Sequence, residues 1–214
     1  MTRVKICGIK TVEQAAVALE AGADYLGFIF YPPSHRYVRP ATVGEIVAAC
    51  RERFGGPDRW CAVGVFVDVP IDQAREICAT SSLDLAQLCG AEDRAYAEQL
   101  GLPVIRVVHV DGAGNPSAST LAADHGAARV MLDTKAEGRF GGTGQTYPWP
   151  GVRAAAAEAF LAGGLTPDNV ALAIETARPW AVDVSTGVET DRAKDPTLIR
   201  AFISEVRRVD HDRG

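Results

Sequence analysis

Short apolar runs alternate along the chain with longer segments that carry apolar residues at helical spacing. Runs that are apolar on both faces are typical of buried parallel strands, and apolar residues every three to four positions predict amphipathic helices. The runs predict eight strands, over residues 4–9, 25–30, 62–67, 83–88, 104–108, 129–133, 159–162 and 181–185. The segments between and after them predict helices over about 11–21, 40–54, 70–80, 91–100, 117–124, 149–155, from about 166, and 196–207.

Helix-end signals support several of these boundaries. Thr11 is followed by Gln14 in a capping-box spacing, and Gly22 closes the same helix. Thr166-Pro167-Asp168 places a proline where a first helical turn accepts one, which predicts that the seventh helix starts there.

Regular alternation of strands and helices predicts an α/β protein with a parallel sheet. A count of eight pairs favours a closed barrel over an open doubly wound sheet. We therefore expect a single (β/α)8, or TIM, barrel over residues 1–209, followed by a frayed tail at 210–214. No internal repeat of 20–50 residues is evident.

Composition narrows the functional classes. The 214 residues are 47% hydrophobic and 23% charged with a net charge of −5, which argues against bulk binding of nucleic acid or acidic membranes. No apolar run has the length of a membrane span, and the polar start runs directly into a strand, so no signal peptide is expected. Five scattered cysteines without a CxxC pair predict neither a metal site nor a disulfide framework, and a cytoplasmic location is the simplest expectation.

Two side chains at strand ends form a candidate acid–base pair. In a barrel of this kind the active site lies at the carboxyl ends of the strands. Cys7 ends the first strand and Asp133 ends the sixth, so the two would face each other across the mouth. A thiolate accepts a proton from carbon and a carboxylic acid donates one to oxygen. The structural alternatives are a small buried cysteine and an aspartate that caps a turn.

Glycine-rich turns after the last two strands predict a phosphate site. Gly163 and Gly164 follow the seventh strand, and Ser185-Thr186-Gly187 follows the eighth. Loops at these two positions bind phosphate in many barrels, because small residues let backbone amides approach the anion. A tight turn without a ligand is the alternative for either loop alone.

Two further basic residues have alternative interpretations. Arg36 lies in a loop of aromatic and donor residues after the second strand, which suits an anionic aromatic ligand, although a solvated loop arginine is equally compatible. Lys5 could form a Schiff base, as in an aldolase-like enzyme, or could be a buried partner of Asp183. The second is favoured, because strand parity places Lys5 one layer below the rim. The breaker-rich stretch at 134–144 has the length of a lid.

Several long segments resemble one family, phosphoribosylanthranilate isomerase of tryptophan biosynthesis. They are KICGI at 5–9, GFIFYPPSHRYV at 27–38, VGVFVD at 63–68, LDTK at 132–135, GGTG at 141–144, AGGLTPDNV at 162–170 and VDVSTGVE at 182–189, followed by Lys194-Asp195. The resemblance covers nearly the whole chain.

The resemblance implies an Amadori rearrangement of N-(5-phosphoribosyl)anthranilate without metal or organic cofactor. It implies that Cys7 is the general base, that Asp133 is the general acid, and that Arg36 pairs with the anthranilate carboxylate. It further implies that Asp183 orients the amine. The loops at Gly163-Gly164 and Ser185-Thr186-Gly187 would hold the 5-phosphate.

One position departs from the family pattern. The fourth strand usually ends in Gln-Leu-His-Gly, whereas this chain has Cys89 in place of the histidine. Altered rate or pH dependence would follow if that histidine tunes the base or the ligand.

Two alternatives stay open: a related sugar-phosphate isomerase of the histidine pathway or with dual substrates, and a non-catalytic phosphate-binding barrel. The first usually carries an aspartate as the strand-one base, so Cys7 opposes it. A small-molecule substrate is the expected partner, with a weak preference for a monomer over a homodimer.

Overall fold

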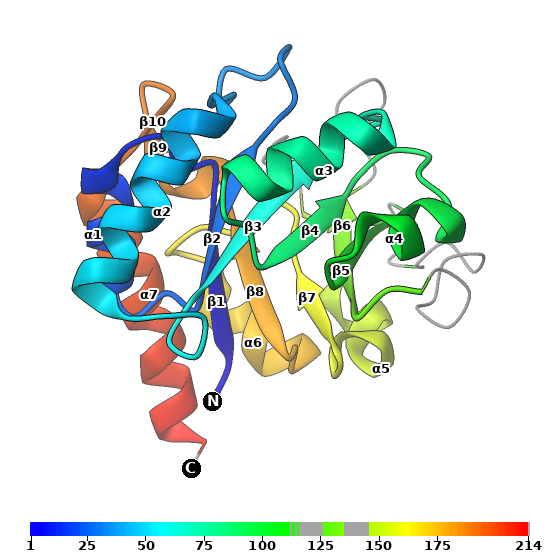
Figure 1. Ribbon diagram of the computed structural model, residues 1–214. Helices are drawn as coiled ribbons and strands as arrows, with labels where there is room; N and C mark the ends of the chain where they lie inside the picture. Colours follow the sequence, from blue (N-terminus) through cyan, green and yellow to red (C-terminus); the bar gives the residue numbers. More distant parts are fainter. Residues whose placement is uncertain (112, 114, 116–125, 135–145, 214) are drawn as a thin grey trace.

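Eight parallel strands close into one barrel in the computed structural model (Figure 1). The structure describes residues 1–111, 113, 115, 126–134 and 146–213. Each strand pairs with the next in the chain, and β1 pairs with β8 to complete the ring. The strands are β1 (Arg3–Cys7), β2 (Tyr25–Ile29), β3 (Cys61–Phe66), β4 (Leu85–Leu88), β5 (Val104–Val110), β6 (Arg129–Thr134), β7 (Ala159–Leu161) and β8 (Ala181–Val184). The prediction of a (β/α)8 barrel is confirmed.

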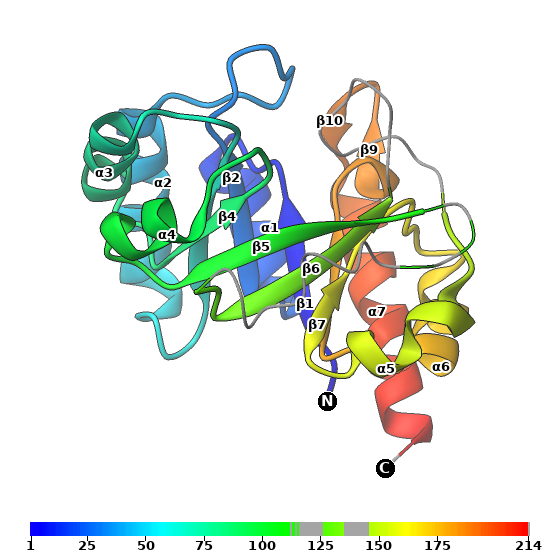
Figure 2. The same ribbon diagram turned by 90° about the vertical axis from the view of Figure 1, so that its right-hand side faces the viewer.

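Helices surround the barrel, with α2, α3 and α4 on one side of the strands and α5, α6 and α7 on the other (Figure 2). Their bounds are α1 (Val12–Ala21), α2 (Pro40–Phe54), α3 (Ile71–Thr80), α4 (Arg94–Leu100), α5 (Arg153–Ala156), α6 (Val170–Ala177) and α7 (Pro196–Asp212). Short 3-10 helices cover Trp149–Val152 and Thr186–Val188. The helix predicted at 117–124 lies outside the described residues. None of the described helices is long and apolar enough to cross a membrane.

Strand parity divides the buried residues into two cores. One core lies between strands and helices, and it contains the side chains of residues such as Val4, Ile6 and Leu26. The other fills the barrel interior and consists of Tyr25, Val63, Ile105, Val107, Met131, Phe160, Ala162 and Ala181. Burial on both faces explains why the strands are apolar runs rather than alternating patterns.

Several predicted boundaries differ from the structure by two residues or more, and the two largest differences lie at helix ends. The helix expected from about 166 begins at Val170, because the Asn169 side chain accepts a hydrogen bond from Thr166 N and holds the preceding residues in a turn. The last helix continues to Asp212 instead of ending near 207. Asp210, assigned to a frayed tail, accepts hydrogen bonds from the Thr2 backbone and hydroxyl, at 2.7 and 2.8 Å.

A small hairpin of β9 (Glu189–Thr190) and β10 (Ala193–Lys194) was not predicted. Its turn residues, Asp191 and Arg192, both have positive φ, at 51° and 65°. Aspartate is common at the first position of such a turn, but arginine replaces the usual glycine at the second, which removes the pattern that would have predicted a hairpin.

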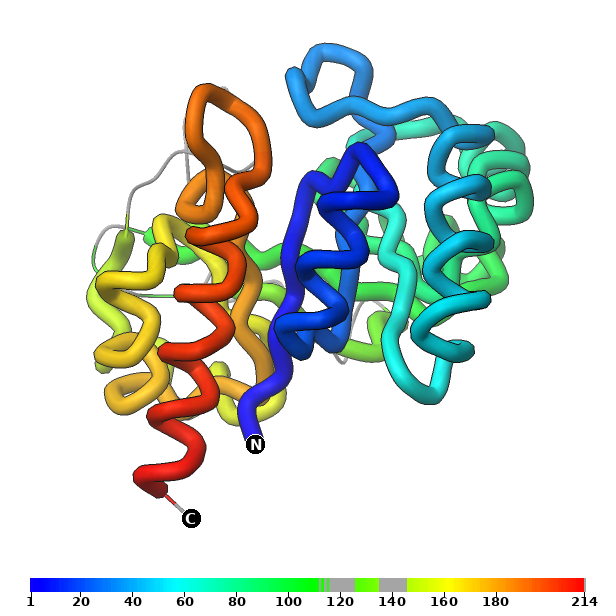
Figure 3. Tube along the Cα trace, turned by 90° about the vertical axis from the view of Figure 1, so that its left-hand side faces the viewer, coloured from blue at the N-terminus to red at the C-terminus, as the bar shows by residue number. Residues whose placement is uncertain are grey.

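The two ends of the chain meet at the closure of the barrel. Helix α7 packs against α1 and β1 (Figure 3). The Arg207 side chain donates to the backbone oxygens of Thr2 and Gly22, at 2.6 and 2.8 Å. Helix α7, at the end of the chain, therefore holds β1 and α1 in place through packing and hydrogen bonds.

Candidate active site

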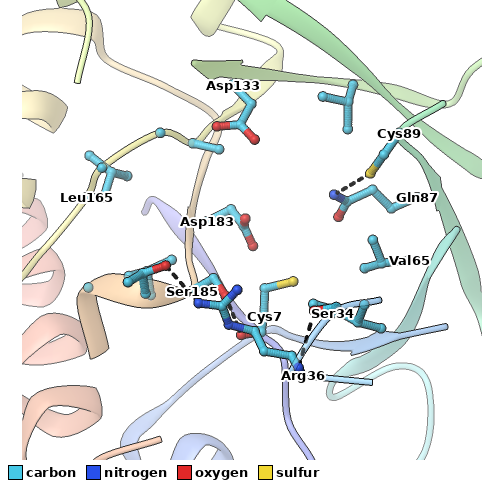
Figure 4. Close-up of a pocket in the computed structure, with 18 of the residues that line it drawn as sticks. Cys7, Ser34, Arg36, Val65, Gln87, Cys89, Asp133, Leu165, Asp183 and Ser185 are labelled. Carbon is cyan, nitrogen blue, oxygen red and sulfur yellow. Dashed lines mark hydrogen bonds between the residues drawn. The ribbon is translucent and has the colours of Figure 1, made fainter. Parts of the chain in front are cut away.

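A cavity of about 310 Å³ opens at the carboxyl ends of the strands (Figure 4). Cys7, Arg36, Asp133, Asp183, Gly163, Gly164, Ser185, Thr186 and Gly187 all line it. The structure thus brings together every residue that the sequence singled out for catalysis or substrate binding.

Cys7 occupies the end of β1, where Gly8 turns the chain with a φ of 86°. Burial raises the pKa of the Cys7 thiol, and the neighbouring Lys5 ammonium opposes this rise. The Cys7 backbone oxygen accepts a hydrogen bond of 3.1 Å from Ser185 Oγ on the loop after β8. The backbone at Cys7 is therefore held against the loop that follows β8.

Asp133 lies near the end of β6, across the mouth from Cys7, and Asp183 lies between them (Figure 4). Burial and the Asp183 carboxylate raise the pKa of Asp133 to about 6. The Thr134 amide donates a hydrogen bond of 2.8 Å to Asp133 Oδ1. Gly163, with a φ of 90°, passes so close to Thr134 that any side chain there would collide with its hydroxyl.

Lys5 is fully buried and its Nζ lies 2.9 Å from Asp183 Oδ1. The two residues are register partners on β1 and β8. Lys5 does not line the cavity, so the buried pair favoured by strand parity is present and a Schiff base with substrate has no support in the structure.

Arg36 reaches the cavity from the loop after β2 and is held by two residues near β8. Its Nε and Nη2 donate to the two carboxylate oxygens of Glu189, at 2.7 and 2.8 Å, and Nη2 also donates to Thr186 Oγ1 at 2.9 Å. Burial opposes ionisation of Glu189, but hydrogen bonds from Arg36 and Lys194 outweigh it and lower the Glu189 pKa to about 2. Arg36 is thus an oriented, buried guanidinium rather than a solvated loop residue.

The loops after β7 and β8 pack together at the expected phosphate position. Asn169 Nδ2 donates a hydrogen bond of 2.9 Å to the Gly164 oxygen and so shapes the first loop. A side chain at Gly187 would collide with the backbone oxygen of Leu165. Glycine at 187 therefore allows the two backbones to come into direct contact.

Cys89 lines the cavity from the end of β4. Gln87 Nε2 lies 3.4 Å from its sulfur, and burial raises the pKa of Cys89 to about 12. The thiol at this position, where the family pattern has a histidine, therefore remains protonated near neutral pH.

Four residues of the site and its support had no assigned role in the sequence interpretation. Gln87 and His109 line the cavity, while Glu189 and Lys194 hold Arg36 in place. Strand parity could have found the first two, because each lies two residues beyond an interior position of β4 or β5. The predicted lid at 134–144 lies outside the described residues except for Thr134.

A family model and a curated relative both connect this chain with one enzyme family. The family described as N-(5'phosphoribosyl)anthranilate (PRA) isomerase matches residues 4–205. A curated isomerase of that name from Citrifermentans bemidjiense is 41% identical over 212 residues, covering 98% of both chains.

Two solved structures extend the likeness to the fold. Phosphoribosyl anthranilate isomerase from Thermus thermophilus has a TM-score of 0.82 at 33% identity, over 97% of this chain and 100% of its own. A second isomerase structure, in complex with reduced 1-(o-carboxyphenylamino)-1-deoxyribulose 5-phosphate, has a TM-score of 0.76 at 31% identity over the same shares. The chain belongs to the phosphoribosylanthranilate isomerase family, whose members are aldose–ketose isomerases of tryptophan biosynthesis.

Proposed function

We propose that this chain rearranges N-(5-phosphoribosyl)anthranilate to 1-(2-carboxyphenylamino)-1-deoxyribulose 5-phosphate, with Cys7 as general base and Asp133 as general acid. One observation carries the assignment: the thiol and the carboxyl group reach a single cavity from opposite sides of the barrel mouth (Figure 4). The raised pKa of Asp133, about 6, suits a group that donates a proton near neutral pH.

The reaction begins when Asp133 protonates the ribose ring oxygen. The bond from this oxygen to C1 breaks, and the nitrogen lone pair forms a C1–N double bond, which gives an open-chain iminium. The Cys7 thiolate then removes the proton from C2, and the electrons of that bond make the C1–C2 double bond of an enolamine. Loss of the C2 hydroxyl proton and gain of one at C1 yield the ketone. A proton passes from Cys7 to Asp133, by way of solvent, to restore the starting state.

Arg36 supplies the recognition of the anthranilate carboxylate in this proposal. Two of its nitrogens bind Glu189, while Nη1 has no hydrogen-bond partner within the described part of the chain. A guanidinium fixed in this way is preorganised for a carboxylate, because little side-chain freedom is lost on binding.

Gly163, Gly164, Ser185, Thr186 and Gly187 would hold the 5-phosphate between the loops after β7 and β8. The close backbone packing of these loops at Gly187 favours an anion site built from amides and hydroxyls. Asp183 would orient the substrate amine, with its Oδ1 already bound by Lys5.

We further propose that the protein is a monomer and lies in the cytoplasm. Among the described residues the exposed large hydrophobic side chains are Met1, Val12 and Leu172. Three such side chains are too few for an extended apolar patch, which favours a monomer. One solved relative, from Thermotoga maritima, is a dimeric enzyme, so light scattering on the purified chain decides this point. A cytoplasmic location suits an enzyme with five free cysteines.

The test follows the fluorescence of anthranilate-type substrate, generated in place, with excess downstream synthase. Wild-type turnover is expected, with losses of at least about a hundredfold in Cys7→Ala and in Asp133→Ala, the size typical of positioned acid–base groups. Absence of wild-type turnover would refute the proposed substrate. Near-normal turnover by either variant would refute the role of that residue.

A further inference from the structure

The buried side chain of Lys5 lies next to the Cys7 thiol and takes no part in the proton transfers proposed above. We propose that Lys5 is a positioning residue that, anchored by Asp183, holds its ammonium group against Cys7 and stabilises the thiolate form of the base. This inference rests on the proposed role of Cys7, but it concerns a residue that does not contact the cavity.

The placement of Lys5 follows from β1. Lys5 and Cys7 are two residues apart in one strand, so their side chains leave the same face. Lys5 is fully buried, and its Nζ lies 2.9 Å from Asp183 Oδ1 on the adjacent strand. The Lys5 ammonium group is therefore held in place by Asp183, whose carboxylate also lines the cavity.

The neighbouring strand gives independent evidence that the two side-chain tips meet. Gly27 on β2 is the register partner of Cys7. A Cβ atom at Gly27 would lie 2.8 Å from Cys7 Sγ and 2.9 Å from Lys5 Nζ. Both tips thus occupy one small space, which exists because residue 27 has no side chain.

The charges around Cys7 favour an effect of Lys5 on the thiolate. The ionisable groups that act on the thiol at close range are Lys5, Asp183 and Lys194, with Cys89 and Asp133 across the mouth and Arg36 beside Gly8. Burial raises the Cys7 pKa, and Lys5 is the strongest opposing influence. Burial would by itself lower the pKa of Lys5, but Asp183 and Cys7 outweigh it and keep the ammonium charged.

The alternative is that the Lys5–Asp183 pair only holds β1 and β8 together. Buried ion pairs are poor stabilisers, because desolvation costs several kcal/mol per ion and an apolar pair of similar volume is often as stable. A buried lysine in the barrel interior is therefore not explained by stability alone. It is explained if the neighbouring Cys7 thiol must ionise in order to act as a base.

The experiment measures how the rate of Cys7 alkylation by iodoacetamide depends on pH, read by mass mapping of the Cys7 peptide. Wild type is compared with Lys5→Met, with Lys5→Arg, and with Lys10→Met as an exposed control just beyond the same strand. We expect the midpoint to rise by at least about one pH unit in Lys5→Met, with kcat/KM reduced at least about tenfold, since one pKa unit is a factor of ten. In Lys5→Arg, which keeps a positive charge, the Cys7 midpoint should rise less than in Lys5→Met. In Lys10→Met it should equal the wild-type midpoint.

Two further variants keep the proposal testable if Lys5→Met does not fold. Lys5→Met combined with Asp183→Leu removes both buried charges, and a smaller upward shift of the Cys7 midpoint is expected because Lys5 acts on Cys7 more strongly than Asp183 does. Gly27→Ala drives the two tips apart without removing a charge, and should also raise the midpoint. An unchanged midpoint in a folded Lys5 variant would overturn the proposal and leave the pair a structural one, whatever the isomerase activity of the wild type.

Discussion

A carboxyl group that is buried beside another carboxylate holds its proton to unusually high pH, and Asp133 is such a group. The burial that supports the proposed role of Asp133 as general acid also costs the folded protein stability once the group ionises. Its pKa is about 6 in the folded chain and near 3.9 in an unfolded one, so the penalty is absent below about pH 4 and complete above about pH 6.

Asp133→Asn should therefore stabilise the protein in a pH-dependent way. At pH 8 the free energy of unfolding is expected to rise by about 1–3 kcal/mol, because the amide keeps the hydrogen bond from Thr134 without the charge. At pH 4 the variant and wild type should match. Urea denaturation at both pH values measures this, and an equal difference at the two values would contradict the assigned pKa.

The two thiols of the cavity are expected to behave differently. The pKa of Cys89, about 12, leaves it protonated and unable to serve as a second base. We expect Cys89→Ser to retain kcat within about tenfold, whereas Cys7→Ser loses at least about a hundredfold. Steady-state kinetics with the coupled assay compares them, and a hundredfold loss in Cys89→Ser would show that the departure from the family pattern carries function.

Among the secondary-structure elements, the hairpin of β9 and β10 positions Arg36, the residue proposed to bind the anthranilate carboxylate. Lys194 on β10 donates a hydrogen bond of 2.6 Å to Glu189 Oε1. The two carboxylate oxygens of Glu189, on β9, also accept hydrogen bonds from Arg36. The hairpin thereby connects the loop after β2 to the loop after β8. These two segments are about 150 residues apart in the chain, and both line the cavity at the barrel mouth.

Glu189→Gln should weaken substrate binding more than chemistry. The amide cannot hold the guanidinium through two charged hydrogen bonds, so we expect KM to rise about tenfold or more while kcat changes less. Glu205→Gln, which alters an exposed ion pair with Arg208, serves as control. A fall in kcat with KM unchanged would contradict a role in orienting Arg36.

At the scale of the whole molecule, barrel closure depends on contacts between the two chain ends. Asp210 binds both the amide and the hydroxyl of Thr2, more than 200 residues away in the chain. Asp210→Ala is expected to lower the free energy of unfolding by about 1–3 kcal/mol, because it removes two partly buried hydrogen bonds to a charged group. Denaturant unfolding measures this against Asp212→Ala, and equal effects of the two substitutions would contradict a role of Asp210 in closure.

The barrel and most of its site were predictable because local patterns and strand parity decide them. Apolar runs predicted the eight strands, and strand ends predicted that Cys7 and Asp133 lie at the mouth, whereas Asp183 came only from the family resemblance and as a partner for Lys5. The hairpin turn at Asp191-Arg192 was not predictable, since aspartate suits the first position of such a turn but arginine stands where glycine is usual. The partnership of Arg36 with Glu189 and the extension of α7 to Asp212 depend on contacts between distant parts of the chain, which no local pattern records.

Single-turnover kinetics isolates the two proton transfers assigned to Cys7 and Asp133 from substrate binding and product release. Excess enzyme is mixed with phosphoribosylanthranilate, and the loss of substrate fluorescence is followed for wild type, Cys7→Ser and Asp133→Asn. We expect substrate loss in both variants to be at least about a hundredfold slower than in wild type, since each keeps the shape of the site but lacks one transfer. A wild-type rate in either variant would contradict the acid–base assignment.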